Sequence, residues 1–331
     1  MVNGKNYGLI DLHLHLDGSL SVRTVRELAR MQQKALPERE EDLLRILQVS
    51  GDCKDLNEYL EKFDFPCALL QTEQAITLAV SNLMEELAEQ GLRYAEIRFA
   101  PQLHTHQGLT QHQVVRAATA GLEGARIPGS LILCCMRMAD NLEENLATVE
   151  AAAEFLGHGV CAVDLAGAEA LFPTANFEPV FRLARQKQIP MTIHAGEAAG
   201  PDSIRKALEF GARRIGHGVR CLEDPELVRH LAQTGVTLEL CPTSNLNTCI
   251  FPDIRSYPLR QLMAAGVKVC INTDNMTVSG VTIRSEMALV AETFSLTEEE
   301  LAVLLRNGVD ACFASDAVKS ELIQVLDKLA N

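Results

Sequence analysis

Five residues that can bind a metal ion or move a proton lie at the ends of short apolar segments. They are His13 and His15 in DLHLHLDG, His194 in TIHAGE, His217 in RIGHGV and Asp274 in INTDN. Alternate side chains of a strand share one face, so His13 and His15 can hold the same ion. Together with His194 and Asp274 they form three imidazoles and one carboxylate, a ligand set suited to a zinc-like divalent ion. A lone histidine at a strand end is more often bonded to backbone, so it is the ordered set that predicts a metal site.

Eight short apolar or β-branched segments are predicted as strands, and helical patterns lie between them. The predicted strands are 8–13, 94–99, 130–137, 160–165, 190–194, 214–217, 236–240 and 267–272. The predicted helices include 74–90, 142–155, 179–188, 202–210, 225–234 and 259–265. Eight β/α repeats predict a closed (β/α)8 barrel, the TIM barrel fold, whose active sites gather at the carboxyl ends of the strands. An open doubly wound sheet would keep the first and last strands apart, whereas barrel closure brings their ligands together.

Two parts of the chain depart from the simple repeat. About 80 residues separate the first two strands, which is far longer than an ordinary connection. The charged segment 37–62 has helical patterning, and we interpret about 19–75 as a helical lid inserted above the barrel mouth. A capping-box pattern at Thr297 and Glu300 starts C-terminal helices that run to Leu329 and are expected to pack against the barrel. Residues 1–331 are therefore predicted to form one domain.

Composition limits the classes of partner. The chain has 331 residues, 47% hydrophobic content and a net charge of −14, which argues against binding nucleic acid or an anionic membrane surface. A small, uncharged or cationic substrate fits better, and homo-oligomerisation is left open. The start lacks the apolar segment of a signal peptide, and no apolar segment is long enough to span a bilayer. Ten cysteines show no CxxC spacing, so we expect a cytoplasmic protein without a disulfide framework.

Seven motifs, in a fixed order, resemble those of the adenosine deaminase family of metal-dependent hydrolases. They are HLHLDGSL, ILCCMR, DLAGAE, HAGE, RIGHG, CPTSN and NTDN, and the resemblance runs from about Leu9 to Ser279. It implies a zinc-dependent barrel that replaces the 6-amino group of adenosine, and of 2′-deoxyadenosine, with water to give inosine and ammonia. Such an enzyme is a hydrolase acting on a C–N bond of a cyclic amidine in purine nucleotide metabolism.

The resemblance also implies roles for individual residues. One Zn²⁺ per chain would be held by His13, His15, His194 and Asp274. Bound metal lowers the pKa of water, which then attacks C6 of the purine. Glu197 would donate a proton to ring N1, and His217 would hydrogen-bond the attacking oxygen. Asp274 would also accept the proton of the water, which makes Glu197, His217 and Asp274 the implied catalytic residues.

Contacts to the nucleoside follow from the same resemblance. The implied substrate-binding residues are His15, Asp17, Gly167 and Asn275. Asp17 would accept a hydrogen bond from a ribose hydroxyl, and the Gly167 N–H would face purine N3. Asn275 stands where many members have an acidic residue facing N7, and an amide donates there at any pH. Ala168 is a second departure, because an acidic residue often follows the glycine.

Several alternatives stay open at this point. Adenine or a modified adenine nucleoside could be the substrate, although Asp17 favours a nucleoside. A catalytically silent purine-nucleoside-binding relative is a different class, which the presence of both Glu197 and His217 disfavours. A second metal would need a lysine near the end of the fourth strand, but that strand carries Asp164. The PCxxC segment of cytidine-type deaminases is absent.

Other polar residues are given supporting or surface positions. Glu239, in the predicted seventh strand, is a candidate acceptor for the second nitrogen of a ligand histidine. His104 and His106 follow Pro101 and are predicted to lie in a loop, at the rim or on the surface. Three further histidines are assigned to the surface: His112, His158 and His230.

Overall fold

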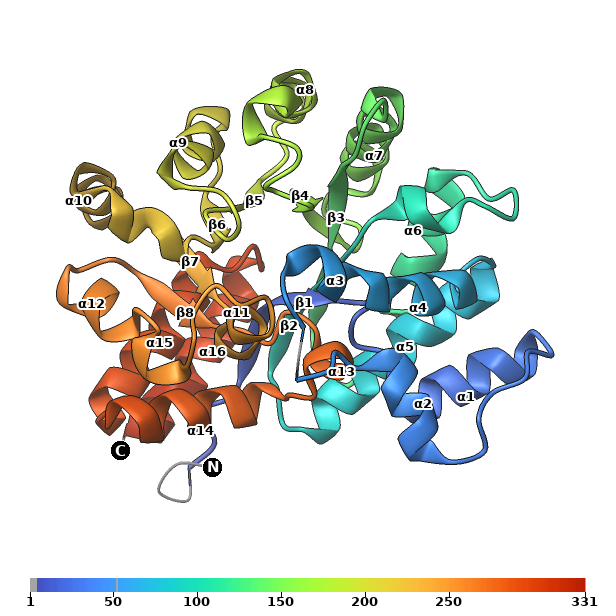
Figure 1. The fold of residues 1–331 in the computed structure, drawn as a ribbon, viewed down its shortest axis with the longest axis horizontal. Helices are drawn as coiled ribbons and strands as arrows, with labels where there is room; N and C mark the ends of the chain where they lie inside the picture. The colour runs from blue at the N-terminus through green and yellow to red at the C-terminus, as the bar shows by residue number, and fades with distance from the viewer. Residues whose placement is uncertain (1–4, 52, 331) are drawn as a thin grey trace.

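Eight short parallel strands occupy the centre of the computed structural model, which describes residues 5–51 and 53–330 (Figure 1). The strands are β1 Ile10–His15, β2 Tyr94–Phe99, β3 Gly129–Arg137, β4 Val160–Gly167, β5 Thr192–Ala195, β6 Arg214–His217, β7 Thr237–Leu240 and β8 Val269–Ile271. Every predicted strand is present. Their apolar residues are almost all buried, as expected for parallel strands covered by helices.

The strands form two four-stranded sheets that join into a barrel at two places. The sheets have the orders β1-β2-β3-β4 and β5-β6-β7-β8. Val163 in β4 pairs with Met191 just before β5, and Leu14 in β1 pairs with Asp274 just after β8. At the second junction His15 N–H donates to the Asp274 carbonyl and Asp274 N–H donates to the His13 carbonyl, both at 2.7 Å. The residues expected to bind metal therefore also close the barrel.

Strand β1 extends further than predicted. The sequence placed its end at residue 13, whereas the structure continues the strand to His15. His15 is paired with Arg98 of β2 as well as with Asp274, so backbone hydrogen bonds on both sides hold it in extended conformation. Both histidines of the HxH motif thus belong to one strand, and their side chains share a face.

Helices alternate with the strands and surround them, as Figure 1 shows. The helices of the repeat are α5 Glu73–Glu89, α6 Gln111–Ala120, α7 Leu142–Phe155, α8 Glu178–Gln186, α9 Pro201–Phe210, α10 Pro225–Thr234 and α12 Leu259–Ala264. Short helices α11 Pro242–Asn247 and α13 Met276–Ser279 follow β7 and β8 at the barrel mouth. Five 3₁₀ helices complete the connections: η1 Glu61–Phe63, η2 Pro101–His104, η3 Thr174–Phe177, η4 Val219–Glu223 and η5 Ile254–Ser256.

The long connection after β1 is helical, as predicted. It contains α1 Val22–Met31, α2 Glu40–Leu47, α3 Leu56–Leu60 and α4 Asp64–Leu69 before the first barrel helix, α5. Two contacts fasten it to the segment after β8: Val49 N–H donates to the Val278 carbonyl (2.9 Å), and the Tyr59 hydroxyl lies 2.7 Å from Ser279 Oγ. These contacts hold α3 and its neighbours over the carboxyl ends of the strands.

Helices α14 Ile283–Phe294, α15 Glu298–Ala311 and α16 Asp316–Ala330 end the chain. Thr297 and Glu300 make the predicted capping box at the start of α15. Helix α15 packs against β1, β7, β8 and α16, which confirms the expectation that this region is a packing element. None of the helices in the described part of the chain combines the length and apolar character needed to cross a membrane.

Candidate metal and catalytic site

Three imidazoles and one carboxylate converge at the carboxyl end of the barrel. The donor atoms of His13, His15, His194 and Asp274 all lie within 4.8 Å of one another. The two Nε2 atoms of His15 and His194 are 3.3 Å apart, and Asp274 Oδ1 lies 3.4 Å from Nε2 of both His13 and His15. Among the described residues, the only polar atoms near the buried Nε2 of His13 are those of this cluster, such as Asp274 Oδ1, so a cation between them would complete its coordination. The cluster fits one divalent ion, as the sequence predicted.

Close backbone packing makes room for these side chains. Gly216 in β6 lies against the cluster, and a Cβ atom there would come 3.0 Å from His13 Cε1. A Cβ atom here would crowd the His13 ring and the His194 backbone, which would have to give by a few tenths of an ångström, so glycine fits this close approach best. Asp274 itself has a φ of 63° and His217 a φ of 58°. Both are uncommon for residues with side chains, and such strain is concentrated at functional sites.

Buried carboxylates fix the orientation of two of the imidazoles. Nδ1 of His13 lies 2.7 Å from Glu239 Oε2, and Nδ1 of His194 lies 2.8 Å from Asp164 Oδ2. A carboxylate at Nδ1 favours the tautomer that leaves Nε2 free to bind metal. The predicted contact between Glu239 and a candidate ligand histidine is confirmed. Asp164, noted in the sequence only because no lysine stands there, lies beside the His194 ring and also accepts the His194 backbone N–H at 3.1 Å.

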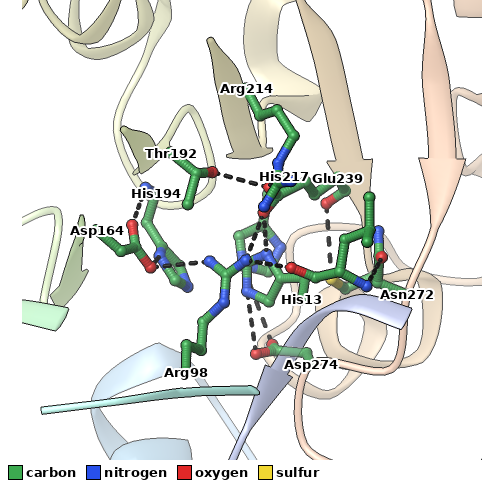
Figure 2. Close-up of polar contacts among 12 residues, drawn as sticks. His13, Arg98, Asp164, Thr192, His194, Arg214, His217, Glu239, Asn272 and Asp274 are labelled. Atoms are coloured by element: carbon green, nitrogen blue, oxygen red, sulfur yellow. Dashed lines mark hydrogen bonds and ion pairs between the residues drawn. The ribbon is translucent and has the colours of Figure 1, made fainter. Parts of the chain in front are cut away.

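The guanidinium of Arg98 links these two carboxylates. Figure 2 shows it between Asp164 and Glu239, and its nitrogens lie 2.8 Å from an oxygen of each. Glu239 has a second cation, because Arg214 Nε donates to its Oε1 at 2.6 Å. All four charged side chains are fully buried. No sequence signal pointed to Arg98, because its carboxylate partners lie on two other strands and meet it only when the barrel closes.

The charges keep these acids ionised despite burial. Burial raises the pKa of Asp164, but the charges of His194 and Arg98 outweigh it and hold the pKa below its usual value. For Glu239, burial is likewise outweighed, by Arg98 and Arg214, and the pKa lies well below normal. The pKa of Asp274 is also well below normal, since the hydrogen bond and charge of His13 overcome burial. Ionised carboxylates therefore surround the imidazoles, whose Nε2 atoms face the centre of the candidate metal cluster.

Glu197 has the opposite electrostatic environment. Burial, followed by the charge of Asp274, raises its pKa to about 8. Its side chain is held by long contacts, with Asn245 Nδ2 at 3.3 Å and Thr248 Oγ1 at 3.5 Å. A carboxyl group with this pKa is protonated at neutral pH and can act as an acid.

His217 is neutral and orientated. Burial lowers its pKa to about 4, so the imidazole carries no charge at neutral pH. Asn245 Nδ2 donates to His217 Nδ1 at 3.0 Å, while the Tyr257 hydroxyl donates to Asn245 Oδ1. An accepting Nδ1 leaves the proton on Nε2, which lies 3.7 Å from Glu197 Oε2 and 4.0 Å from Asp274 Oδ2.

These groups open onto a cavity of about 610 Å³ under the helices that follow β1. A cavity of this size can enclose a small organic ligand. Apart from buried His13, every residue predicted for catalysis, metal binding or substrate contact lies on its wall: His15, Asp17, Gly167, His194, Glu197, His217, Asp274 and Asn275. Leu56, Tyr59 and Phe63 cover it from the inserted helices.

The predicted substrate residues have distinct surroundings. Burial raises the pKa of Asp17 to about 6, and its Oδ2 accepts a 3.5 Å contact from the Cys67 thiol. Gly167 ends β4 with a φ of 104°, a conformation that favours glycine. Asn275 is buried, and its Oδ1 has no hydrogen-bond partner within the described residues. These groups are available to a ligand in the cavity.

The second HxH motif is divided between core and rim. His104 is fully buried in η2 and packs against Phe99, with 5.7 Å between ring centroids, so its prediction as a loop or surface residue was wrong. The short helix that starts at Pro101 turns this side chain inward, which the proline alone did not reveal. His106 lines the cavity, as a rim residue would. His158 and His230 are exposed and His112 is partly exposed, as predicted.

Fold and donor set together define a metal-dependent hydrolase built on a β/α barrel. A family-wide sequence model described as "Adenosine deaminase" matches residues 9–329. The chain belongs to the adenosine deaminase family, and it is a hydrolase acting on C–N bonds of cyclic amidines.

Individual relatives agree with this family. Adenosine deaminase from Haemophilus ducreyi is 48% identical over 326 residues, covering 96% of this chain and 95% of that protein. The crystal structure of adenine deaminase from Arthrobacter aurescens has a TM-score of 0.88 at 28% identity, covering 98% and 99% of the two chains. An Arabidopsis N6-mAMP deaminase has a TM-score of 0.85 at 27% identity, covering 97% and 98%. The two solved structures are thus named for different substrates, adenine and N6-mAMP.

Proposed function

We propose that this chain hydrolyses the 6-amino group of adenosine and 2′-deoxyadenosine, giving the inosine product and ammonia. The observation that carries the proposal is one cavity wall with a protonated carboxyl, a neutral imidazole and a metal-type donor cluster. Hydrolysis at C6 requires an acid for the ring, stabilisation of the attacking oxygen and an activated water. The similarity to curated adenosine deaminases supports this substrate over other amidines.

Glu197 is the acid in this proposal. With a pKa of about 8 it keeps its proton at neutral pH and can deliver it to ring N1. Protonation at N1 draws electron density from C6 and makes that carbon electrophilic.

His217 and Asp274 act on the attacking water. The Nε2–H of His217 faces the cavity and hydrogen-bonds the oxygen as charge develops on it. Asp274 is ionised, and its Oδ2 accepts a 2.6 Å hydrogen bond from Ser244. It can therefore take the proton of the water and pass it to the departing amine.

We assign one Zn²⁺ per chain to His13, His15, His194 and Asp274. Three imidazole nitrogens and one carboxylate oxygen are the donor types that zinc prefers. The ion would supply Lewis-acid chemistry, lowering the pKa of water. The side chains of Asp164 and Glu239 hold two of the rings ready for it.

Nucleoside recognition is proposed for His15, Asp17, Gly167 and Asn275. All four line the cavity, with Asp17 offered to a ribose hydroxyl, the Gly167 N–H to N3, and Asn275 to N7 of the base. The Asn275 amide can donate to N7 without a titrating proton. A nucleoside, rather than a nucleic acid or a membrane lipid, is the proposed ligand, in keeping with the net charge of −14.

We further propose that residues 19–75 form a lid within one domain spanning 1–331. The proposal is supported by Leu56, Tyr59 and Phe63, which line the cavity from these inserted helices. A cytoplasmic location is proposed on the ten free cysteines, which fit a reducing compartment.

The test is a substrate panel with metal analysis on one purified preparation. Adenosine, 2′-deoxyadenosine, adenine and N6-methyl-AMP are each followed by ultraviolet absorbance after zinc loading. We expect turnover of the two nucleosides and one zinc per chain. Faster turnover of adenine or N6-methyl-AMP would reassign the substrate, and binding of adenosine without turnover would make the chain a silent nucleoside-binding relative.

A further inference from the structure

The loop that carries Glu197 is held by a second buried carboxylate, that of Glu169. Residues 196–199 follow β5 and belong to no helix or strand. Glu169 lies in the turn after β4 and is only 2% exposed. It is the final residue of the DLAGAE motif, and no function was expected for it from the sequence.

Four consecutive backbone N–H groups of this loop donate to Glu169. Gly196 N–H donates to Oε1 at 2.7 Å, and Glu197, Ala198 and Ala199 donate to Oε2 at 3.0, 2.8 and 2.9 Å. The Ser203 hydroxyl, in the first turn of α9, also donates to Oε1. In all five contacts Glu169 is the acceptor, and its two oxygens offer about four lone-pair sites, so some donors share a site. Successive N–H groups that converge in this way form an anion-binding concavity, filled here by the side chain of the protein itself.

The carboxyl side chain of Glu197 lacks a comparable restraint. Its contacts with Asn245, Thr248 and His217 are between 3.3 and 3.7 Å. The direction in which it points is therefore set mainly by its backbone, and that backbone is fixed through Glu169. Misplacing a catalytic group by about 1 Å can cost about 100-fold in rate.

A buried chain of polar contacts anchors Glu169 in turn. Ser203 Oγ lies 2.7 Å from Thr174 Oγ1, which accepts from Arg137 Nη2 at 3.0 Å. The same Arg137 nitrogen donates to the His194 carbonyl at 2.6 Å. These contacts connect three segments around the loop 196–199: the turn after β4, the end of β5 and the start of α9.

We propose that Glu169 is a positioning residue for the reaction, which orders residues 196–199 and so aims the acid Glu197 at the substrate. The inference rests on the proposed deaminase function. Glu169 is not among the residues that line the cavity. It acts through the backbone of its neighbour.

The test uses Glu169→Gln in the full-length, zinc-loaded enzyme. Glutamine keeps the shape but replaces one accepting oxygen with a donating NH₂ group, which must face at least one loop N–H. We expect backbone hydrogen exchange in 196–199 to accelerate by about tenfold or more, because these amides lose their acceptor. We expect kcat to fall by about tenfold to 100-fold while KM changes by less than about threefold and zinc content is unchanged.

Asp224→Asn is the matched control. Asp224 is also a carboxylate that accepts two backbone N–H groups, from Glu226 and Leu227 in the first turn of α10, but it lies outside the cavity wall. This variant should lower Tm without changing kcat or exchange in 196–199. Ser203→Ala, which removes one donor to Glu169, should shift exchange and kcat in the same direction by a smaller factor, and it serves if Glu169→Gln does not fold.

Failure of the inference and failure of the proposed function are separable. If the wild-type chain does not deaminate adenosine, the function is wrong, and the exchange experiment still tests the loop. If the wild type is active and Glu169→Gln has unchanged kcat, or unchanged exchange in 196–199, Glu169 does not position the acid. A loss of kcat matched by Asp224→Asn would also overturn the inference, because it would reflect general destabilisation.

Discussion

Replacing Glu197 with glutamine should make the metal-free protein more stable while abolishing most of its activity. Glutamine has the shape of a protonated glutamic acid but cannot release a proton. In the folded chain the pKa of Glu197 is raised to about 8 by burial and by the charge of Asp274, from an ordinary value of 4.5. At neutral pH the carboxyl is therefore ionised in the unfolded chain and protonated in the folded one.

The size of the stabilisation follows from proton linkage. Folding at pH 7 must drive a proton onto this carboxyl, against a cost of about 1.4 kcal/mol for each pH unit above 4.5, or about 3 kcal/mol in all. Because the pKa of Glu197 is higher in the folded chain than in the unfolded one, this cost to the free energy of folding is absent below pH 4.5. It grows as the pH rises and becomes constant above about pH 8. A glutamine does not titrate, and Glu197→Gln should recover about 3 kcal/mol at pH 7 and almost nothing at pH 4.5.

Urea unfolding of the metal-free proteins at several pH values measures this difference. The matched control is Glu209→Gln, an exposed carboxylate on α9, for which we expect a change below about 0.5 kcal/mol at every pH. In the zinc-loaded enzyme Glu197→Gln should retain zinc and nucleoside binding and lose at least about 100-fold in kcat. Equal or lower stability than the wild type at pH 7 would refute the raised pKa, and near-normal turnover would show that another group supplies the proton.

Three further predictions concern the same site. Arg98→Lys keeps the positive charge but loses the two-pronged guanidinium that joins Asp164 to Glu239. Zinc affinity, measured against a competing chelator, should therefore fall by about tenfold. The control Arg260→Lys, which loses hydrogen bonds to the Phe294 and Ser295 carbonyls, should leave zinc affinity unchanged. The kcat/KM for adenosine should decline at alkaline pH as Glu197, whose pKa is raised by burial, loses its proton, and a flat profile to pH 9.5 would contradict its role as the acid. Removing the metal with a chelator should abolish turnover. Adding back zinc at about 1,000 times its Kd should restore turnover and raise the free energy of unfolding by about 4 kcal/mol. Full activity of the metal-free enzyme would exclude the metal assignment.

The barrel was predictable because its signals are local. Each strand is a short apolar segment, each helix a longer periodic one, and the C-terminal ends of the strands carry the polar residues. Boundaries were less certain, and β1 shows why. It continues to His15 because residues 98 and 274 pair with its backbone, and those partners are far away in sequence.

The supporting residues of the site were harder to find. Glu239 was expected beside a ligand histidine, since such ligands usually need an acceptor. Arg98 and Glu169 carried no comparable signal, because one is a charge inside a strand and the other a glutamate in a turn. His104 was misplaced for a related reason: the short helix at Pro101 turned it toward the core.

By itself the sequence determined which residues could bind metal, which could donate a proton and in what order they occur along a β/α chain. Residue type and periodicity are properties of neighbouring positions, so both can be read without coordinates. Only the tertiary structure decided the protonation states and the directions of these groups. A pKa depends on burial and on charges that barrel closure brings close together. The direction of the Glu197 side chain depends on Glu169, which is 28 positions away in the chain although its Oε2 lies 3.0 Å from the Glu197 backbone nitrogen.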